Sequence, residues 1–367
     1  MVDNPGEDLG ASSSTGKGGA GSTLQPGAAP DPVIPFMLML GACILQYTEE
    51  LKQSSFDFGL AAYGGTFFCY DPVLFRVKFS ISVCGIHNMT SQAVSSENRP
   101  PKASVIISVY KDTEALKGML DALDRQTEKD FEIIVTEDCE SEEMDRFLAE
   151  YRKRPNFYHL TQPDDGWRKT LAENRAIASA RADYLMFLDG DCYPDRNFVA
   201  LHLANAEPGK FLTGRRVYLG PVFSRIMRKW PWLIRVIENR LIFLLLLIPM
   251  HLDKVRSYEV GLSSRFMHWL RGKKPVGIIG CNFSCYKKDI LAINGYNEDL
   301  PGVGAEDSDL QWRFEGLGMS TKAVKFLIPV YHLYHEHKRL NYDVNLNIIN
   351  ANRKLNAFIC KNGIRKL

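Results

Sequence analysis

The chain has 367 residues, 45% of them hydrophobic, which is enough for one large α/β domain with additions or for two smaller domains. Its 45 Lys and Arg against 43 Asp and Glu exclude an overall field that would gather nucleic acid, so we expect no nucleic-acid partner. The eight cysteines lack the paired spacing of a zinc site, and a chain this long needs no disulfide framework, so we expect reduced thiols in a cytosolic compartment.

The first 100 residues form an extension of low complexity or uncertain structure. Residues 3–31 are rich in Gly, Ser, Ala and Pro, which predicts disorder. The apolar patch at 33–47 is shorter than the about 20 residues that a membrane-spanning helix needs, and it lacks the basic flank of a signal peptide. Met89 stands before a polar linker, so a start at Met89, with residues 1–88 dispensable, is one hypothesis.

Strands and helices alternate regularly over residues 101–218. Apolar, β-branched runs predict strands at 103–110, 131–136, 156–160 and 183–188. Helices are predicted after the N-caps Asp112 and Ser141 and over residues 168–181. Successive strand–helix pairs predict a parallel, right-handed α/β sheet, whose ligands bind at the carboxyl ends of the strands.

An acidic turn follows the strand at 183–188. Asp189 and Asp191 flank Gly190, which allows the backbone to approach a ligand closely. Two carboxylates can share one hard cation, and oxygen ligands favour Mg²⁺ or Mn²⁺, which would neutralise a diphosphate. The alternative is a solvated turn that caps a helix.

Further candidate ligands surround this turn in the sequence. Glu137 and Asp138 end the second strand, and a carboxylate there can accept from the ring N–H of a uracil, with Asp138 the better candidate; a helix cap is the alternative. Trp167, Arg168 and Arg175 place an aromatic ring and two guanidiniums upstream of the acidic strand. Arginine suits diphosphate recognition.

The order of these motifs resembles the family 2 glycosyltransferases. The resemblance rests on Glu137-Asp138, Asp-Gly-Trp-Arg (165–168), Asn-Arg-Ala-Ile (174–177) and Phe-Leu-Asp-Gly-Asp-Cys-Tyr-Pro (187–194). Gly-Cys-Asn-Phe-Ser-Cys (280–285), Gly-Tyr-Asn-Glu-Asp (295–299) and Gly-Ala-Glu-Asp-Ser-Asp-Leu (304–310) resemble the C-terminal half of β-1,4-galactosyltransferases and chondroitin-type polymerases. The resemblance covers about residues 103–340 of the chain. The resemblance implies a GT-A nucleotide-sugar-binding fold, a mostly parallel Rossmann-like sheet flanked by helices.

The resemblance also implies roles in the C-terminal half. Asp307 is expected to be the catalytic base, and Glu306 to contact the acceptor or donor sugar. Related galactosyltransferases have Gly-Gly-Glu-Asp-Asp here. The two positions that differ in this chain, Ala305 and Ser308, leave the base in place, but they leave the identity of the acceptor undetermined.

The resemblance assigns the metal and nucleotide to Asp189 and Asp191, with a histidine beyond the base completing the metal shell. Residues 330–337 offer three histidines. His332, at the end of a predicted strand, is the first choice and His335 the second.

Residues 219–274 lie outside the family pattern and are predicted to form a helical insertion, followed by the acceptor and catalytic-base half at 275–340 and a helical tail at 341–367. The insertion contains the apolar run 241–248 and tryptophans beside basic residues. Such a composition favours a peripheral contact with anionic lipid headgroups through 220–274. A helical subdomain packed on the core is the alternative.

These observations together predict an inverting, metal-dependent glycosyltransferase. It would transfer a hexose or N-acetylhexosamine, galactose-type favoured, from a UDP-sugar to a glycan or lipid-linked glycan, at the inner face of the cell membrane. The alternatives are a non-catalytic carbohydrate-binding or scaffold protein and a sugar nucleotidyltransferase. A glycoside hydrolase would need neither a nucleotide site nor a metal.

Overall fold

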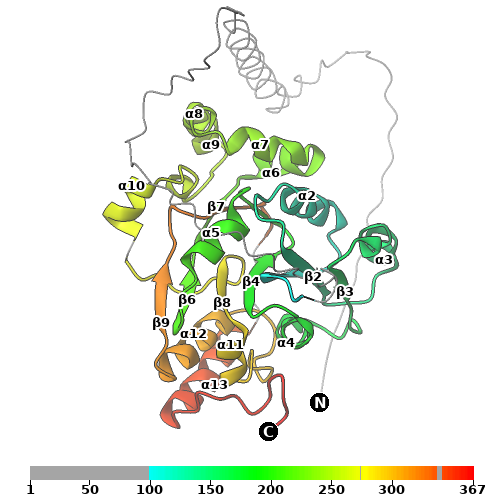
Figure 1. Ribbon diagram of the computed structural model, residues 1–367, viewed down its shortest axis with the longest axis vertical. Coiled ribbons are helices and arrows are strands. Elements are labelled where there is room, and N and C mark those ends of the chain that lie inside the picture. The colour runs from blue at the N-terminus through cyan, green and yellow to red at the C-terminus, as the bar shows by residue number, and fades with distance from the viewer. Residues whose placement is uncertain (1–98, 273, 337–340) are drawn as a thin grey trace, which may run out of the picture. The chain divides into compact units, whose positions relative to one another are not determined.

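The computed structural model describes residues 99–272, 274–336 and 341–367 (Figure 1). The predictions made for residues 1–98, including the hypothesis about Met89, lie outside the described residues, as does His337. The described part is a mixed α/β structure built around a central sheet.

The central sheet of the described residues has seven strands, and its first half matches the prediction. Strands β3, β2, β1 and β4 lie side by side and parallel, whereas β8 runs antiparallel to both of its neighbours, β4 and β6, and β9 is parallel to β6. The sheet is therefore mostly parallel, as predicted. In spatial order the strands are β3 (Phe157–Leu160), β2 (Phe131–Glu137), β1 (Ala103–Val109), β4 (Tyr184–Asp189), β8 (Phe283–Tyr286), β6 (Lys210–Thr213) and β9 (Ser320–Ala323).

Helices cover both faces of this sheet. One buried cluster joins Ile106 and Phe187 of the sheet to Ile177 of α4, Ile290 of α11 and Phe314 of α12, so these three helices share a face (Figure 1). The helices outside the insertion are α2 (Thr113–Asp124), α3 (Glu142–Leu148), η2 (Tyr151–Lys153), α4 (Lys169–Ser179), α5 (Phe198–Asn205), α11 (Lys287–Ala292), α12 (Glu306–Gly316) and α13 (Tyr342–Lys354).

The predicted N-caps are confirmed. The Asp112 side chain accepts a hydrogen bond from the N–H of Ala115 at 2.9 Å, and the Ser141 side chain accepts from Met144. Each cap satisfies a backbone donor that the first turn of a helix leaves without a partner. The polar loop before each helix and its apolar stripe thus fix where α2 and α3 begin.

A small second sheet, which the sequence did not predict, lies beside the acidic turn. It has the order β5 (Cys192–Pro194), β10 (Pro329–His332) and β7 (Arg215–Tyr218). In the antiparallel pair of β10 and β5, His332 lies opposite Cys192, and the N–H of Leu333 donates to the carbonyl of Asp191 at 3.0 Å. This pairing brings residues 332–335 next to a turn that lies about 140 residues earlier in the chain.

The insertion is helical, as predicted, and its inner side packs on the α/β domain. Arg125, which follows α2, makes a two-pronged ion pair with Glu238, at 3.0 and 3.2 Å, and Phe243 packs inside against Tyr331. None of the described helices is long and apolar enough to cross a bilayer. The insertion consists of α6 (Pro221–Lys229), η3 (Pro231–Leu233), α7 (Ile234–Ile237), α8 (Arg240–Leu245), α9 (Leu247–Leu252), η4 (Tyr258–Val260), α10 (Arg265–Met267) and the π-helical turn η5 (His268–Gly272).

Candidate active site

A cavity of about 420 Å³ lies at the carboxyl ends of β1, β2 and β4, where parallel α/β sheets bind their ligands. Its walls come from the strand ends, from the start of α4, from the turn at Gly280, from α12 and from residues that follow β10. Segments more than 200 residues apart in the sequence therefore share one cavity.

The acidic turn forms one wall of this cavity. The N–H of Gly190 donates to the carbonyl of Ser108 at 2.8 Å, which ties the turn to the end of β1. A Cβ atom at Gly190 would lie 3.1 Å from a methyl group of Val109, so glycine allows the turn to lie close against β1. Asp189 and Asp191 both line the cavity, as the sequence predicted for a strand-end turn.

Asp189 is neutralised by cations of the protein. The Lys169 ammonium lies 2.6 Å from Asp189 Oδ1, and the Arg216 guanidinium lies 3.9 Å from Oδ2. Burial works to raise the pKa of Asp189, but the Lys169 charge and hydrogen bond outweigh it, with a smaller effect of Arg216, and hold the pKa below its usual value. This aspartate therefore stays ionised.

Asp191 faces two histidines instead. Its Oδ2 atom lies 3.3 Å from His335 Nε2 and 3.5 Å from His332 Nε2. Burial, followed by the charge of Asp189, raises the pKa of Asp191 to about 6. One ligand atom from each of Asp191, His332 and His335 lies within 4.8 Å of the others, so the three side chains could hold one metal ion. The strand pairing of β10 thus brings together both histidines that the resemblance proposed.

Asp307 lies in the first turn of α12 on the other side of the cavity. Its Oδ2 atom accepts from the N–H of Gly280 at 2.9 Å. Burial, followed by the charge of Glu306, raises the pKa of Asp307 to about 7, although Lys169 works in the opposite direction. Glu306 also lines the cavity, and its Oε2 atom accepts from the N–H of Gly304 at 2.7 Å. A carboxyl group with such a pKa is suited to take a proton at neutral pH.

Lys169 links the two acidic sides of the cavity. Besides its 2.6 Å contact to Asp189, its ammonium lies 3.6 Å from Glu173, and the charge of Asp307 also acts on it. A Cβ atom at Gly280 would lie 3.3 Å from both Lys169 Nζ and Asp307 Oδ1, so glycine leaves room for this arrangement. Burial works to lower the pKa of Lys169, but these carboxylates raise it well above its usual value. The lysine therefore stays protonated.

The predicted nucleotide residues separate into two groups. Asp138 and Trp167 line the cavity, and Asp138 accepts hydrogen bonds from the Gln162 side chain at 2.6 Å and from the Arg168 N–H at 2.8 Å. Glu137 does not line it: its buried carboxylate lies 3.1 Å from His159 Nε2. Adjacent residues at the end of β2 point to opposite sides, so only Asp138 can reach a ligand in the cavity.

The two predicted arginines are also absent from the cavity wall. The guanidinium of Arg168 lies 3.3 Å from Asp165, and that of Arg175 donates to the carbonyl of Thr161. The cations that do line the cavity are Lys169, Arg216 and Arg228. Lys169 directly follows Arg168 in the sequence, but only the turn into α4 shows which of the two cations faces inward.

Two sequence families match this chain in succession. Residues 104–268 match the family described as "Glycosyl transferase family 2", and residues 262–336 match the "N-terminal domain of galactosyltransferase". These matches include residues 219–274, so the prediction that this segment lies outside the family pattern was wrong. This chain carries a family 2 glycosyltransferase domain. Its fold, a mostly parallel sheet with helices on both faces and an acidic turn at a strand end, is of the GT-A type.

Several glycosyltransferases resemble this family 2 domain. Validoxylamine A glucosyltransferase of Streptomyces hygroscopicus subsp. jinggangensis is 27% identical over 233 residues, which cover 60% of this chain and 52% of that protein. Hyaluronan synthase of Pasteurella multocida is 26% identical over 129 residues, 34% of this chain and 13% of that protein. The crystal structure of S. aureus TarS aligns with a TM-score of 0.44 at 13% identity, covering 68% of this chain and 39% of that one. The chain spans about half the length of the glucosyltransferase.

Proposed function

We propose that this chain is an inverting, metal-dependent glycosyltransferase that uses a UDP-sugar. The sugar would be a hexose or N-acetylhexosamine, galactose-type favoured, and the acceptor a hydroxyl of a glycan or lipid-linked glycan, as in surface polysaccharide or lipopolysaccharide assembly. One observation carries the proposal: a single cavity joins Asp307, with its pKa of about 7, to the carboxylate and imidazoles of Asp191, His332 and His335. Membership of family 2 supports the reaction class.

The donor set around Asp191 fits a divalent cation. One carboxylate and two imidazoles suit Mn²⁺ better than Mg²⁺, because Mg²⁺ prefers oxygen ligands. A cation held there would neutralise the negative charge that develops on a departing diphosphate. The residues that would hold it are Asp191, His332 and His335, and Asp189 is the fourth candidate of the sequence prediction.

The remaining cavity residues suit a nucleoside diphosphate. Asp138 can accept from the ring N–H of uracil, and Trp167, which is 46% exposed, offers a ring face at the cavity wall. Arg216 and Arg228 present guanidiniums that can pair with phosphate oxygens. They would bind the diphosphate in place of Arg168 and Arg175, for which the sequence predicted that role.

The proposed reaction is a single displacement. Asp307 takes the proton of the acceptor hydroxyl as that oxygen bonds to the anomeric carbon, and the bond from the anomeric carbon to the diphosphate oxygen breaks on the opposite face. The bonding electrons leave with the nucleoside diphosphate, so the configuration at the anomeric carbon inverts. Glu306, next to the base, would contact the acceptor or donor sugar.

The alternatives differ from this proposal in specific observations. A sugar nucleotidyltransferase needs a glycine-rich phosphate loop after its first strand, whereas β1 is followed by Tyr110, Lys111 and Asp112. A non-catalytic carbohydrate-binding protein would need no carboxyl group poised near neutral pH. The raised pKa of Asp307 therefore favours an enzyme.

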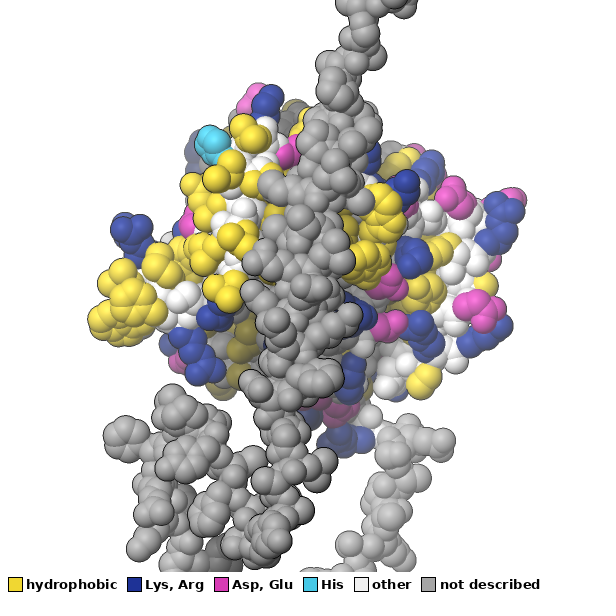
Figure 2. Space-filling model, turned by 90° about the horizontal axis from the view of Figure 1, so that it is seen from above, with side chains coloured by type: hydrophobic (Ala, Val, Ile, Leu, Met, Phe, Trp, Pro, Cys, Tyr) yellow, Lys and Arg dark blue, Asp and Glu magenta, His cyan; other side chains and the backbone are white. Residues whose placement is uncertain are grey.

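We also propose that the insertion lies against a membrane on the cytoplasmic side. Within the described residues of 219–274, every exposed Asp, Glu, Lys or Arg is a Lys or Arg. The three acidic residues there are partly buried: Glu238 pairs with Arg125, Asp253 accepts from the first N–H groups of α6, and Glu259 is the third. Large apolar side chains are exposed beside these cations, and Figure 2 shows hydrophobic groups with Lys and Arg among them on the face above α6 to α9. These exposed apolar residues are Trp232, Leu241, Leu244, Leu245, Ile248, Leu252, Phe266, Trp269 and Leu270.

The exposed composition fits an anionic lipid surface. Apolar side chains would enter the headgroup region while the cations pair with lipid phosphates, each cation contributing about 1 kcal/mol. The inner side of α6 to α9 packs on the domain, so the membrane contact is proposed for the exposed side alone. Such a position would present the cavity to a lipid-linked acceptor.

Calorimetry followed by a transfer assay tests the proposed function. UDP-galactose, UDP-N-acetylgalactosamine and UDP-glucose are titrated into the full chain with Mn²⁺, and the tightest donor is then incubated with glycan acceptors while UDP release is measured. We expect binding that EDTA abolishes and UDP release that depends on acceptor. Binding without acceptor-dependent release in any donor and acceptor pair would favour the carbohydrate-binding alternative.

A further inference from the structure

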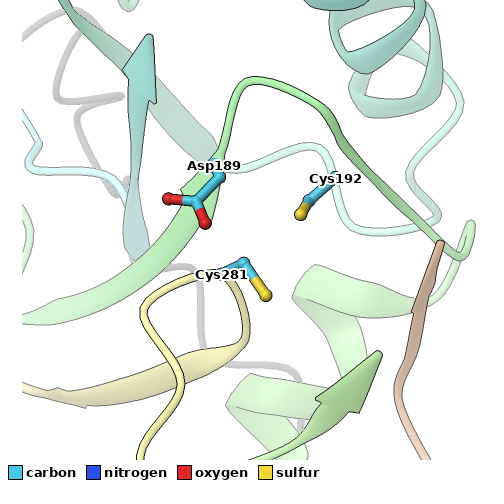
Figure 3. A group of neighbouring side chains, drawn as sticks. All are labelled: Asp189, Cys192 and Cys281. Carbon is cyan, nitrogen blue, oxygen red and sulfur yellow. The ribbon is translucent and has the colours of Figure 1, made fainter. Parts of the chain in front are cut away.

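A second group of candidate metal ligands lies on the other side of the acidic turn. Asp189, Cys192 and Cys281 each place one ligand atom within 4.8 Å of the others, and Figure 3 shows the three neighbouring side chains. Cys192 begins β5, and Cys281 follows the turn at Gly280 that holds Asp307. This group shares no residue with Asp191, His332 and His335.

The size of this group fits a small cation. The centre of an equilateral triangle with sides of 4.8 Å lies about 2.8 Å from each corner, and Zn²⁺ binds thiolates at about 2.3 Å and carboxylates at about 2.0–2.2 Å. Side-chain movements of about half an ångström would therefore close the shell. The ion would enter past Asp189, which lies on the cavity wall, because both cysteines are fully buried.

The charges around Asp189, Cys192 and Cys281 also fit a bound divalent cation. A divalent ion with two thiolates and one carboxylate carries a net charge of −1. Arg216 donates to Cys281 Sγ at 3.2 Å, and Lys169 lies 2.6 Å from Asp189, so two cations stand beside that charge. Both thiols are fully buried, which protects a metal–thiolate bond from competing water.

We infer that Asp189, Cys192 and Cys281 form a binding site for a thiophilic divalent cation of the Zn²⁺ class, beside the three residues Asp191, His332 and His335 that are proposed to hold Mn²⁺. Two sulfur ligands select such an ion over Mn²⁺ and Mg²⁺. On binding, each thiol loses its proton to solvent, and two metal–sulfur bonds form. Because Asp189 belongs to the cavity wall, occupation would also inhibit the proposed transfer, so this consequence rests on the proposed function.

Cobalt spectroscopy tests the site without any donor or acceptor. Co²⁺ is titrated into the full chain, and absorbance is followed in the near-ultraviolet, where thiolate-to-cobalt charge transfer appears. We expect a thiolate band that saturates as Co²⁺ is added and that Zn²⁺ removes. In Cys281→Ser and in Cys192→Ser, the band should be lost or weakened and Zn²⁺ affinity should fall at least about tenfold.

Two control variants separate this site from its neighbours. Cys285→Ser changes another buried thiol of the same segment and should keep the band, as should His332→Ala/His335→Ala. Melting curves identify any variant that fails to fold. If one of the two cysteine variants does not fold, the other one shows whether the band depends on the cysteines. Cobalt binding without a thiolate band, or a band that survives in folded cysteine variants, would overturn the site. Since no transfer is measured, either result leaves the glycosyltransferase proposal standing.

Discussion

Replacing Asp307 by Asn isolates the proposed general base. The amide oxygen of Asn can still accept from the N–H of Gly280, so the start of α12 should be kept, but the side chain can no longer take a proton. Loss of a general base costs about 10²–10⁴-fold in rate, and a hundredfold loss corresponds to about 2.7 kcal/mol in the barrier. UDP affinity should stay nearly unchanged, because Asp138 and the acidic turn lie on other elements.

The pH dependence of the same pair of proteins provides a second test. Asp307 acts as a base only when ionised, and its pKa in the free enzyme is about 7. The kcat/KM of the wild type should therefore fall as the pH drops below about 7 and level off above it. The Asn variant should lack this limb and keep only the lower limb, near pH 6, that protonation of Asp191 causes.

Stability should respond to pH in a defined direction. The folded pKa of Asp307 is raised above the usual value of 3.8, so the folded state binds more protons than the unfolded state between about pH 4 and 7. The contribution of Asp307 to stability is thus present at low pH and is lost as pH rises through 7. The melting temperature of the Asn variant, relative to wild type, should increase from pH 5 to pH 8.

Turnover, UDP affinity and melting temperature are measured on one preparation. A carboxylate that only interacts with the helix dipole contributes about 0.3–1 kcal/mol to stability. In that case the variant would be slightly less stable at pH 8 and fully active. Normal turnover in the variant would refute the assignment of the base.

Three other perturbations probe the rest of the site. Asp191→Ala should abolish Mn²⁺-dependent UDP binding in calorimetry, since it removes the carboxylate that both histidines face; unchanged affinity would reduce the turn to a structural role. Lys169→Met should raise the pKa of Asp307 and move the acidic limb of kcat/KM to higher pH; an unmoved limb would disprove the coupling. Leu245→Glu should reduce sedimentation with anionic vesicles, whereas Leu355→Glu, an exposed leucine outside the insertion, should not; equal effects would argue against the membrane face.

The local features of the fold could be predicted from the sequence. Asp112 and Ser141 cap the helices that their positions predicted, and the apolar run of β4 ends at the acidic turn. Such signals involve residues a few positions apart, so sequence alone carries them. The strand-end position of Asp189 and Asp191 also follows from a parallel sheet.

The long-range features of the site could not be predicted in the same way. Lys169 was missed because its partners, Asp189 and Asp307, lie 20 and 138 residues further along the chain. Arg216 belongs to β7, a strand of the second sheet. This strand has too few residues for an alternation of apolar and polar side chains to be recognised in the sequence. Which cations reach the cavity is decided by these pairings and not by the local pattern.

The proposed reaction transfers a glycosyl group by one displacement with Asp307 as the base. Proton NMR of the reaction, run with Mn²⁺, the best donor and its acceptor, reports the anomeric configuration of the first product formed. We expect a product of the configuration opposite to that of the UDP-sugar, formed at least about a hundredfold more slowly by Asp307→Asn. A product that retains the donor configuration, or equal rates for the two proteins, would contradict it.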